Sequence, residues 1–328
     1  MRKIFLLAFF YTSAICASSI PSLSLDLSHT TVSGISSGGY MAGQFHIAHS
    51  DWVKGVAIIA AGPYYCAENS LSVALSRCIN KQETIPLQKL LSHIKQSSDA
   101  AKIADIKHLE DAKVWIFHGT KDEKVNQSVT DALAQQYQAL IKNNQLEYVN
   151  TQPFAHHFPT QSYGTACDQS VAPYLGNCEY NAAANMLSFI LPNVKPAAAV
   201  STGEIIAINQ QQLGGDSAST LAETGYLYIP KQCKEGLKCQ LHISFHGCNQ
   251  YSAAEDIGTQ YVEHTGLNQF ADSNDFVVFY PQTKKSLYMP MNPQGCWDWW
   301  GYTGADYSTR SGKQINAVTQ IVQSLNAG

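Results

Sequence analysis

The clearest chemical signal in the sequence is a serine between two glycines, in the segment Gly34-Ile35-Ser36-Ser37-Gly38. A β-rich run precedes this segment and a helical pattern follows it, which is the strand–turn–helix context of a nucleophile elbow. Glycines leave room for a sharp turn that lifts the serine hydroxyl out of a sheet. We predict that Ser36 is a nucleophile. The alternative is a turn that only reverses the chain.

A nucleophilic serine needs a base that takes its proton and an acid that orients the base. In α/β-hydrolases these follow the serine in the order acid, then histidine. Asp122 comes just after an apolar run at 113–117, where a triad acid belongs, and Glu123 is the nearest substitute. The next run leads to His156 and His157. Spacing alone leaves both open, and His156 is the preferred base.

Acyl transfer also needs two N–H groups that bind the oxyanion. The residue after the nucleophile, Ser37, supplies one of them. A His-Gly motif in a loop after a strand usually supplies the other, and such a motif occurs at 246–247, followed by Cys248. We expect the Cys248 N–H to be the second donor. A rival His-Gly pair at 118–119 is already explained as the lead into Asp122.

The elements that must position these residues alternate between β-rich runs and helical patterns. Helices are predicted to begin at Gly38 and near Ser128, Ala182, Ala253 and Gln314. Strands are predicted at 30–33, 55–60, 113–117, 146–150, 225–229, 240–245 and 276–280. This alternation favours an α/β fold with a mostly parallel sheet and helices on both faces.

The order of the motifs along the chain is unusual. The oxyanion loop normally precedes the nucleophile, whereas here Ser36 comes first and the chain before it has room for about one strand. A circular permutation that moves the front of an α/β-hydrolase fold to its end accounts for this order. The irregular stretch at about 192–220 is then the permutation joint within a single catalytic domain, 19–328. The alternative is a linker between two domains.

The first residues predict export. A basic start, a short apolar run and small residues resemble a secretory signal peptide, which we place at 1–18. Eight cysteines remain after it, and an even count in an exported protein indicates disulfides rather than a zinc site. Spacing cannot fix the pairing. Short separations favour Cys66–Cys78, Cys167–Cys178 and Cys233–Cys239, which leaves Cys248–Cys296.

The composition limits the kinds of partner that we expect for this chain. The formal net charge is −4, only 14% of residues are charged, and no basic cluster occurs, so nucleic acid is not expected as a partner. No segment is apolar enough to anchor the chain in a membrane. We expect a secreted or periplasmic monomer that uses no cofactor and no metal.

Several longer motifs resemble poly(3-hydroxybutyrate) depolymerases of the single-domain type, which have a circularly permuted α/β-hydrolase fold. The similarity runs from about residue 25 to the end and rests on the segments 33–42, 118–122, 156–160, 245–250 and 295–302. It implies Ser36, Asp122 and His156 as the triad. His156 is chosen over its neighbour because the family pattern is His, any residue, then Phe-Pro-Thr. A tryptophan of the ester groove is implied among Trp297, Trp299 and Trp300, with the last two preferred.

The resemblance therefore implies a serine esterase that hydrolyses poly(3-hydroxybutyrate) or its 3-hydroxyalkanoate oligomers through an acyl-enzyme. A carboxylesterase acting on small or plant-derived esters, such as feruloyl or acetyl esters, is the nearest alternative on the same scaffold. A non-catalytic secreted binding protein and a peptidase are the remaining alternatives. His157 departs from the expected pattern because it is bulkier and more polar than the residue expected there, so it can alter the rim of the pocket.

Overall fold

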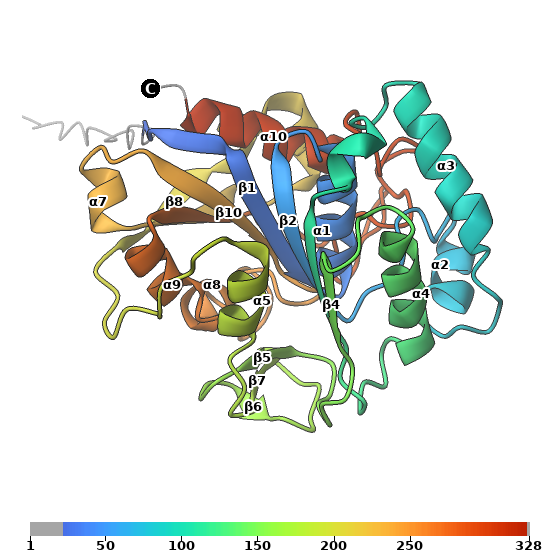
Figure 1. Cartoon of the computed structure of the whole chain (residues 1–328), viewed down its shortest axis with the longest axis horizontal. Coiled ribbons are helices and arrows are strands. Elements are labelled where there is room, and N and C mark those ends of the chain that lie inside the picture. The colour runs from blue at the N-terminus through green and yellow to red at the C-terminus, as the bar shows by residue number, and fades with distance from the viewer. Residues whose placement is uncertain (1–21, 327–328) are drawn as a thin grey trace, which may run out of the picture.

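The centre of the fold is a parallel pair of strands that are far apart in the sequence, β1 and β10, in which Val32 pairs with Ile243 (Figure 1). The computed structural model describes residues 22–326. Its main sheet has eight strands in the order β4-β3-β2-β1-β10-β11-β9-β8. The strands are β1 (Leu25–Ile35), β2 (Val53–Ile59), β3 (Lys113–Phe117), β4 (Leu146–Val149), β8 (Glu204–Asn209), β9 (Thr224–Ile229), β10 (Cys239–Phe245) and β11 (Phe276–Tyr280).

Pairing within this sheet is mostly parallel. All neighbours from β4 to β11 run parallel, and β9 pairs antiparallel with both β11 and β8. The inner strands β2, β3, β10 and β11 are buried along nearly their whole length, as expected where helices cover both faces. Each of the seven predicted runs forms a strand, so the α/β prediction is confirmed.

Helices cover the two faces of the sheet with separate apolar clusters. One cluster includes Phe45 of α1, Ile94 of α3, Leu133 of α4 and Val318 of α10. The other cluster is made by α5, α8 and α9. The helices are α1 (Ser37–Ala48), α2 (Leu71–Arg77), α3 (Leu87–Asp99), α4 (Gln127–Gln138), α5 (Ala182–Ile190), α6 (Gln210–Gly214), α7 (Lys231–Lys234), α8 (Gln260–His264), α9 (Leu267–Asn274) and α10 (Lys313–Leu325), with 3₁₀ turns at Ile106–Leu109 and Gly215–Thr220.

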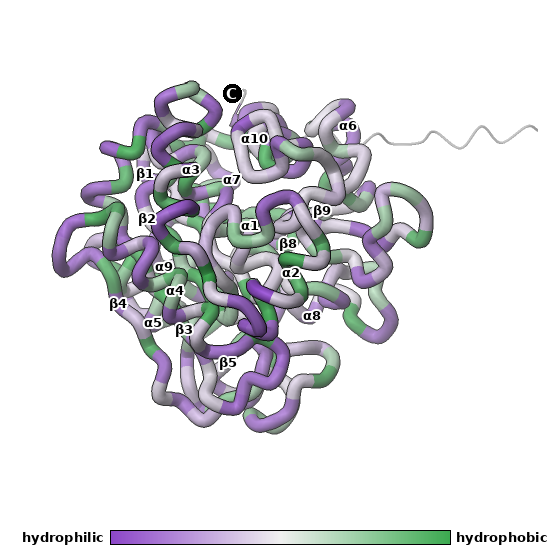
Figure 2. Tube along the Cα trace, turned by 90° about the vertical axis from the view of Figure 1, so that its right-hand side faces the viewer, coloured by the Kyte–Doolittle hydropathy of each residue, from purple (hydrophilic) through white to green (hydrophobic). Residues whose placement is uncertain are grey.

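Four of the five predicted helix starts are found within one residue, at α1, α4, α5 and α10. The helix predicted near Ala253 is wrong, because α8 begins only at Gln260. The intervening segment forms turns in which Asp256 and Gly258 adopt positive φ angles of 59° and 54°. These angles end helical hydrogen bonding at each position. The outer loops of the molecule are largely hydrophilic in Figure 2.

The strand order explains how the chain passes through the fold. β1 lies in the middle of the sheet, and the strands that flank it on the β10 side all come from the later part of the chain. This is the arrangement expected of a circularly permuted α/β-hydrolase. The stretch at 192–220 is not featureless, because β8 lies in it and pairs with β9 at the sheet edge.

Four disulfides cross-link the described residues. The pairs are Cys66–Cys78, Cys167–Cys178, Cys233–Cys239 and Cys248–Cys296, as the spacing favoured. Near the second of these, a small three-stranded sheet is formed by β5 (Phe158–Thr160), β6 (Thr165–Ala166) and β7 (Leu175–Asn177). The predicted signal peptide lies outside the described residues. Within residues 22–326 no helix has the length and apolar character needed to cross a membrane.

Candidate active site

Ser36 occupies a sharp turn between β1 and α1. Its backbone angles are φ 56° and ψ −123°, a conformation that L residues rarely adopt and that costs about 1–3 kcal/mol. The surrounding structure holds this turn. The Ser36 N–H donates to the Ile59 carbonyl at 2.9 Å, and the Ser36 carbonyl accepts from the Tyr40 N–H at 3.0 Å. Backbone hydrogen bonds to a neighbouring strand and to the following helix thus keep the serine in its strained geometry.

The two glycines of the motif are required by close backbone contacts. A Cβ atom on Gly34 would lie 2.1 Å from the Gly38 carbonyl oxygen. A Cβ atom on Gly38 would lie 2.2 Å from the Phe245 carbonyl oxygen. The second contact is the more informative, because Phe245 ends β10 and leads into the predicted oxyanion loop. The first turn of α1 therefore packs directly against the backbone that precedes that loop.

Asp122 and His156 are brought together as predicted. The carboxylate Oδ2 atom of Asp122 lies 2.7 Å from Nδ1 of His156. The other oxygen, Oδ1, accepts the N–H groups of Lys124 and Val125 at 2.8 and 3.0 Å. Burial of the Asp122 carboxyl opposes its ionisation, but the charge and hydrogen bond of His156 and the Val125 N–H outweigh burial and lower its pKa. An ionised carboxylate held in this way can orient an imidazole.

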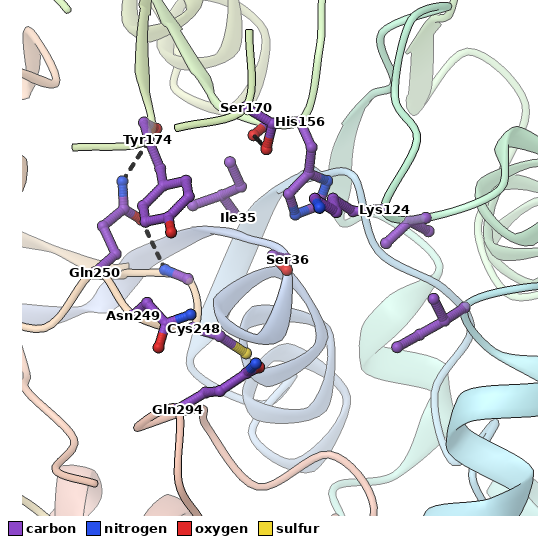
Figure 3. A pocket seen from close by; sticks show the side chains of 13 residues that line it. Ile35, Ser36, Lys124, His156, Ser170, Tyr174, Cys248, Asn249, Gln250 and Gln294 are labelled. Atoms are coloured by element: carbon purple, nitrogen blue, oxygen red, sulfur yellow. Dashed lines mark hydrogen bonds between the residues drawn. The ribbon is translucent and has the colours of Figure 1, made fainter. Parts of the chain in front are cut away.

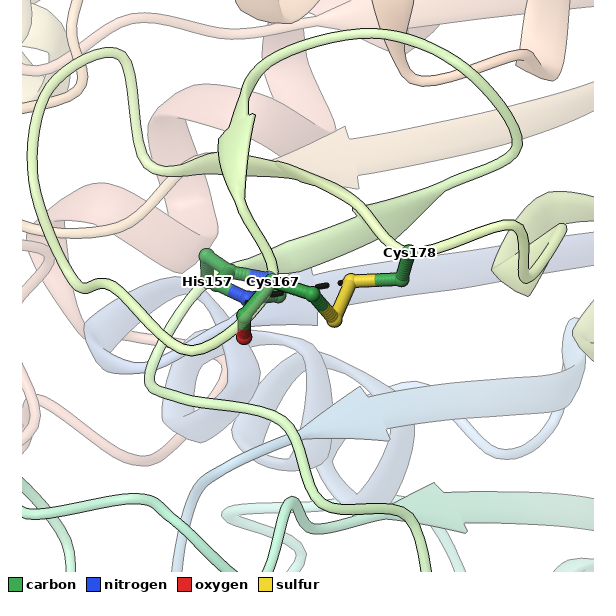
Figure 4. A group of neighbouring side chains, drawn as sticks. All are labelled: His157, Cys167 and Cys178. Atoms are coloured by element: carbon green, nitrogen blue, oxygen red, sulfur yellow. Dashed lines mark hydrogen bonds between the residues drawn. A yellow bond between two sulfur atoms is a disulfide. The ribbon is translucent and has the colours of Figure 1, made fainter.

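His157 is directed away from this pair and into a separate environment. Its Nε2 atom donates to the Cys167 carbonyl at 2.7 Å, and its ring is buried beside the Cys167–Cys178 disulfide (Figure 4). Within residues 22–326, these three side chains form the only cluster with the spacing of a metal site. The two sulfur atoms are bonded to each other and therefore offer no thiolate ligands of the kind zinc uses.

Ser36 and His156 line the same cavity, which has a volume of about 370 Å³ (Figure 3). Apolar side chains from Ile35, Ile79 and Val125 contribute to its wall. Neutral polar groups and one lysine contribute the rest, including Ser170, Tyr174, Gln250, Gln294 and Lys124. The wall of the cavity therefore combines apolar and polar side chains. The lining residues Ser170 and Tyr174 lie in the disulfide-closed loop 167–178, which sequence motifs did not single out.

The predicted oxyanion loop also borders this cavity. Gly247 and Cys248 line it, and within the described part of the chain no acceptor is bonded to the Cys248 N–H. The Gly247 N–H is engaged instead, because it donates to Oε1 of Gln250 at 2.8 Å. Ser37 begins α1, so its N–H has no acceptor within the helix. The two N–H groups predicted to bind an oxyanion are therefore the ones left available.

One disulfide and one hydrogen bond connect the oxyanion loop to the tryptophan-rich segment. The Cys248–Cys296 disulfide joins them directly, and the Asn249 N–H donates to the Gln294 carbonyl at 2.7 Å. The Trp297 N–H donates to Oγ of Ser37 at 3.3 Å. The segment at 294–297 is therefore linked to the two residues that carry the predicted oxyanion donors, Ser37 and Cys248.

The tryptophans themselves pack into the protein. Trp297 is completely buried and meets Phe245 edge to face, with ring centroids 5.0 Å apart. Trp299 is also buried and stacks on Tyr40 at 4.3 Å. Trp300 is partly buried against the same core. None of the three is among the residues lining the cavity beside Ser36. Their packing holds the segment in place, and Trp300 is the one of the three that is only partly buried.

No protein-family model matches the sequence. A polyhydroxybutyrate depolymerase of Talaromyces funiculosus is 32% identical over 330 residues, which cover 96% of this chain and 94% of that protein. A poly(3-hydroxybutyrate) depolymerase of Delftia acidovorans is 37% identical over 317 residues, and the match spans only 62% of its length.

Solved structures show the same similarity. The crystal structure of PHB depolymerase from Penicillium funiculosum has a TM-score of 0.87 and 29% identity, and the match covers 94% of this chain and 99% of that one. The same values are found for a PHB depolymerase with a serine replaced by alanine, complexed with an R3HB trimer. Similarity in both fold and sequence therefore extends over nearly the entire chain.

Proposed function

This chain belongs to the polyhydroxybutyrate depolymerase family, and we propose that it hydrolyses ester bonds of poly(3-hydroxybutyrate) or its oligomers with Ser36 as nucleophile. The observation that carries the proposal is that Ser36, Cys248 and the Asp122-paired His156 line one cavity, and that no acceptor among residues 22–326 is bonded to the Cys248 N–H. The R3HB trimer bound by a related PHB depolymerase supports an oligoester as the ligand of this cavity.

The proposed reaction begins with proton transfer. Because Nδ1 of His156 is hydrogen-bonded to Asp122, its Nε2 atom is left to take the proton of Ser36. The serine oxygen then attacks an ester carbonyl, and the Ser37 and Cys248 N–H groups bind the resulting oxyanion. Removal of one such donor from related sites costs about 3–4 kcal/mol of transition-state stabilisation. The protonated His156 delivers its proton to the departing alcohol, and water releases the acid from Ser36.

A loop with exposed apolar side chains precedes the cavity-lining residue Gln294 in the sequence, and it favours a polymer surface as substrate. The loop that precedes Gln294 presents Leu287, Tyr288 and Met289 with exposed fractions of 67%, 84% and 85%. Large apolar side chains exposed together are typical of interaction surfaces. Since Gln294 itself lines the cavity, this loop would place an aliphatic polyester beside Ser36.

The cellular setting is also proposed. Four disulfides in one chain are typical of proteins from oxidising compartments, which supports secretion or a periplasmic location. Residues 19–328 would then act as a single catalytic domain.

The function is tested by measuring release of 3-hydroxybutyrate from polymer films and from the trimer, alongside p-nitrophenyl butyrate and feruloyl esters. We expect the chain to degrade the film and Ser36→Ala to abolish that activity. Hydrolysis of only the small esters would replace the proposal with the carboxylesterase alternative. Undiminished activity of Ser36→Ala would remove Ser36 as the nucleophile.

A further inference from the structure

The side chain of His246 lies behind the oxyanion loop and contacts the backbone of that loop. Its Nδ1 atom is 2.7 Å from the carbonyl oxygen of Gly247. Its Nε2 atom is 3.2 Å from the backbone nitrogen of Thr283. The ring is fully buried and is not among the groups that line the cavity. His246 therefore does not reach the cavity, and its polar contacts are with the Gly247 carbonyl and with the N–H and the hydroxyl of Thr283, whose oxygen is 3.3 Å from Nε2.

The two backbone contacts determine which nitrogen carries the hydrogen. A carbonyl oxygen only accepts, so Nδ1 must be the donor to Gly247. The backbone N–H of Thr283 only donates, so Nε2 must be the acceptor and carry no hydrogen. The hydroxyl of Thr283 donates instead to the Gly295 carbonyl at 2.5 Å. Burial lowers the pKa of His246 to about 4, so the ring stays neutral in this tautomer.

The contact with Gly247 fixes a peptide plane that matters for the chemistry. The carbonyl of Gly247 and the N–H of Cys248 belong to the same trans peptide, and in a trans peptide these groups point in opposite directions. Holding the carbonyl toward His246 therefore holds the Cys248 N–H toward the opposite side. That N–H is the one left without an acceptor in the described part of the chain, beside Ser36.

We infer that His246 is a positioning residue of the oxyanion hole, whose Nδ1–H group holds the Gly247–Cys248 peptide so that the Cys248 N–H faces the reacting carbonyl. The inference rests on the proposed ester hydrolysis at Ser36. Gln250 complements this arrangement, because its Oε1 atom takes the Gly247 N–H and leaves the next N–H free. A hydrogen bond to a peptide carbonyl also polarises that peptide and makes its N–H a stronger donor.

Two substitutions separate the two ring contacts. In His246→Asn, the side-chain amide nitrogen occupies the place of Nδ1 and can still donate to Gly247. In His246→Gln, the longer side chain places its amide near the former Nε2 position and leaves the Gly247 carbonyl without its donor. Both variants remove the ring from its contact with Trp297, whose centroid is 5.6 Å away, so they share the loss of packing.

The test measures kcat and KM for p-nitrophenyl butyrate with both variants. Complete removal of an oxyanion donor lowers kcat by about 10²–10³-fold, and a donor that is present but misaligned should lose less. We expect kcat to fall by about 10- to 100-fold in His246→Gln and by less than about fivefold in His246→Asn, with KM nearly unchanged in both. Equal kcat values in the two variants, or a loss confined to KM, would overturn the inference.

His242 provides a matched control. It is another fully buried histidine, on β10, and its nitrogens contact the hydroxyls of Thr31 and Ser33 rather than the oxyanion loop. His242→Gln should lower the melting temperature while kcat stays within about twofold of wild type. A loss of kcat as large as that in His246→Gln would show that any buried histidine has this effect, and the inference would fail.

A spectroscopic measurement on the unmodified protein completes the test, and it does not depend on whether the variants fold. Long-range ¹H–¹⁵N NMR correlations distinguish the two neutral tautomers of each histidine. We expect His246 to carry its hydrogen on Nδ1 at neutral pH. The Nε2–H tautomer or an imidazolium would overturn the inference even if Ser36→Ala is inactive, so this outcome is distinct from failure of the proposed function.

Discussion

Gly38 lies so close to Phe245 that a Cβ atom on Gly38 would be 2.2 Å from the Phe245 carbonyl oxygen. The neighbouring backbone on both sides is fixed, because Phe245 belongs to the central strand β10 and Gly38 to the first turn of α1. Neither element can move without displacing one side of the proposed oxyanion hole. The contact thus couples the geometry of the nucleophile turn to that of the loop at 246–248.

We predict that Gly38→Ala abolishes ester hydrolysis and lowers the free energy of unfolding by more than about 1 kcal/mol, because the added methyl group overlaps backbone atoms. Gly43→Ala is the matched control in the same helix, since its Cβ atom would meet only side-chain atoms at ordinary contact distances, the Ile58 Cδ1 atom at 3.4 Å and the Tyr137 hydroxyl at 3.8 Å. That control should retain activity and gain stability from the better helix propensity of alanine. Activity with p-nitrophenyl butyrate and urea unfolding check both variants.

Asp122→Asn should reduce kcat by about 10⁴-fold, because an amide at this position no longer stabilises the imidazolium and favours the wrong tautomer of His156. The exposed neighbour Glu123 supplies the control, and Glu123→Gln should behave like wild type. A large effect of Glu123→Gln, with little effect of Asp122→Asn, would exchange the two roles.

The lowered pKa of Asp122 gives this prediction a second readout. Its ionised form stabilises the fold above the carboxyl's ordinary pKa of 3.8, and this contribution is lost as the pH falls through the lower pKa of the folded protein. Melting temperatures of wild type and Asp122→Asn should therefore differ at pH 7 and converge at the acid end. A difference that stays constant over that range would show that the carboxylate's charge is not responsible.

Because several histidines are buried, we expect the free energy of unfolding to decline in mild acid. Burial lowers the pKa of His242 from 6.5 to about 3, so the unfolded chain binds a proton between these values while the folded protein does not. Stability therefore rises with pH in this window, by about 1.4 kcal/mol per pH unit for one such group. His242→Gln should flatten the dependence of melting temperature on pH between 4 and 6.

Removing the Cys248–Cys296 bridge should affect both stability and catalysis. Its cysteines are 48 residues apart, and loop-closure entropy gives a loss of about 4 kcal/mol for the double alanine variant. The Cys233–Cys239 bridge, with a separation of 6, is the control and should cost about 2 kcal/mol without changing kcat. Loss of kcat only in the first variant would identify the bridge as a support of the oxyanion loop. Equal kcat in both would limit it to stability.

The exposed loop at 287–291 should matter for polymer and not for soluble esters. Replacing Tyr288 and Met289 with serine should weaken adsorption to polyester films and slow film erosion severalfold, with p-nitrophenyl butyrate hydrolysis unchanged. Val200 is 73% exposed in a different part of the chain, and Val200→Ser is the control. If film erosion is unchanged by the double substitution, this loop does not contact the polymer.

Sequence patterns predicted the inner sheet well, because strands covered on both faces must be continuous apolar runs. The edge strand β8 was not predicted, since four of its six residues are exposed and it follows an irregular segment rich in proline and alanine. The misplaced helix near Ala253 has a similar cause. Its composition suits a helix, but left-handed residues at 256 and 258 impose turns that the composition does not reveal.

The proposed triad was accessible from sequence because chain order and loop position constrain it strongly. The contacts that support the proposed triad and oxyanion hole could not be predicted from the sequence. Gln250 and His246 act through backbone groups one to three residues away, and their partners at Tyr174 and Thr283 are distant in the sequence. Only the folded geometry shows that these side chains occupy two of the loop's polar groups and leave the Cys248 N–H free.

The permuted strand order has a consequence for how the protein folds. The two strands at the middle of the sheet pair Thr31 with His242, so the central ladder cannot form until most of the chain has been synthesised. Contacts between such distant segments slow folding, because the entropy of closing a long loop is lost before the contacts are gained. Until β10 is available, the edge of β1 with which it pairs therefore stays exposed. A delay of this kind gives aggregation more time to compete with native folding.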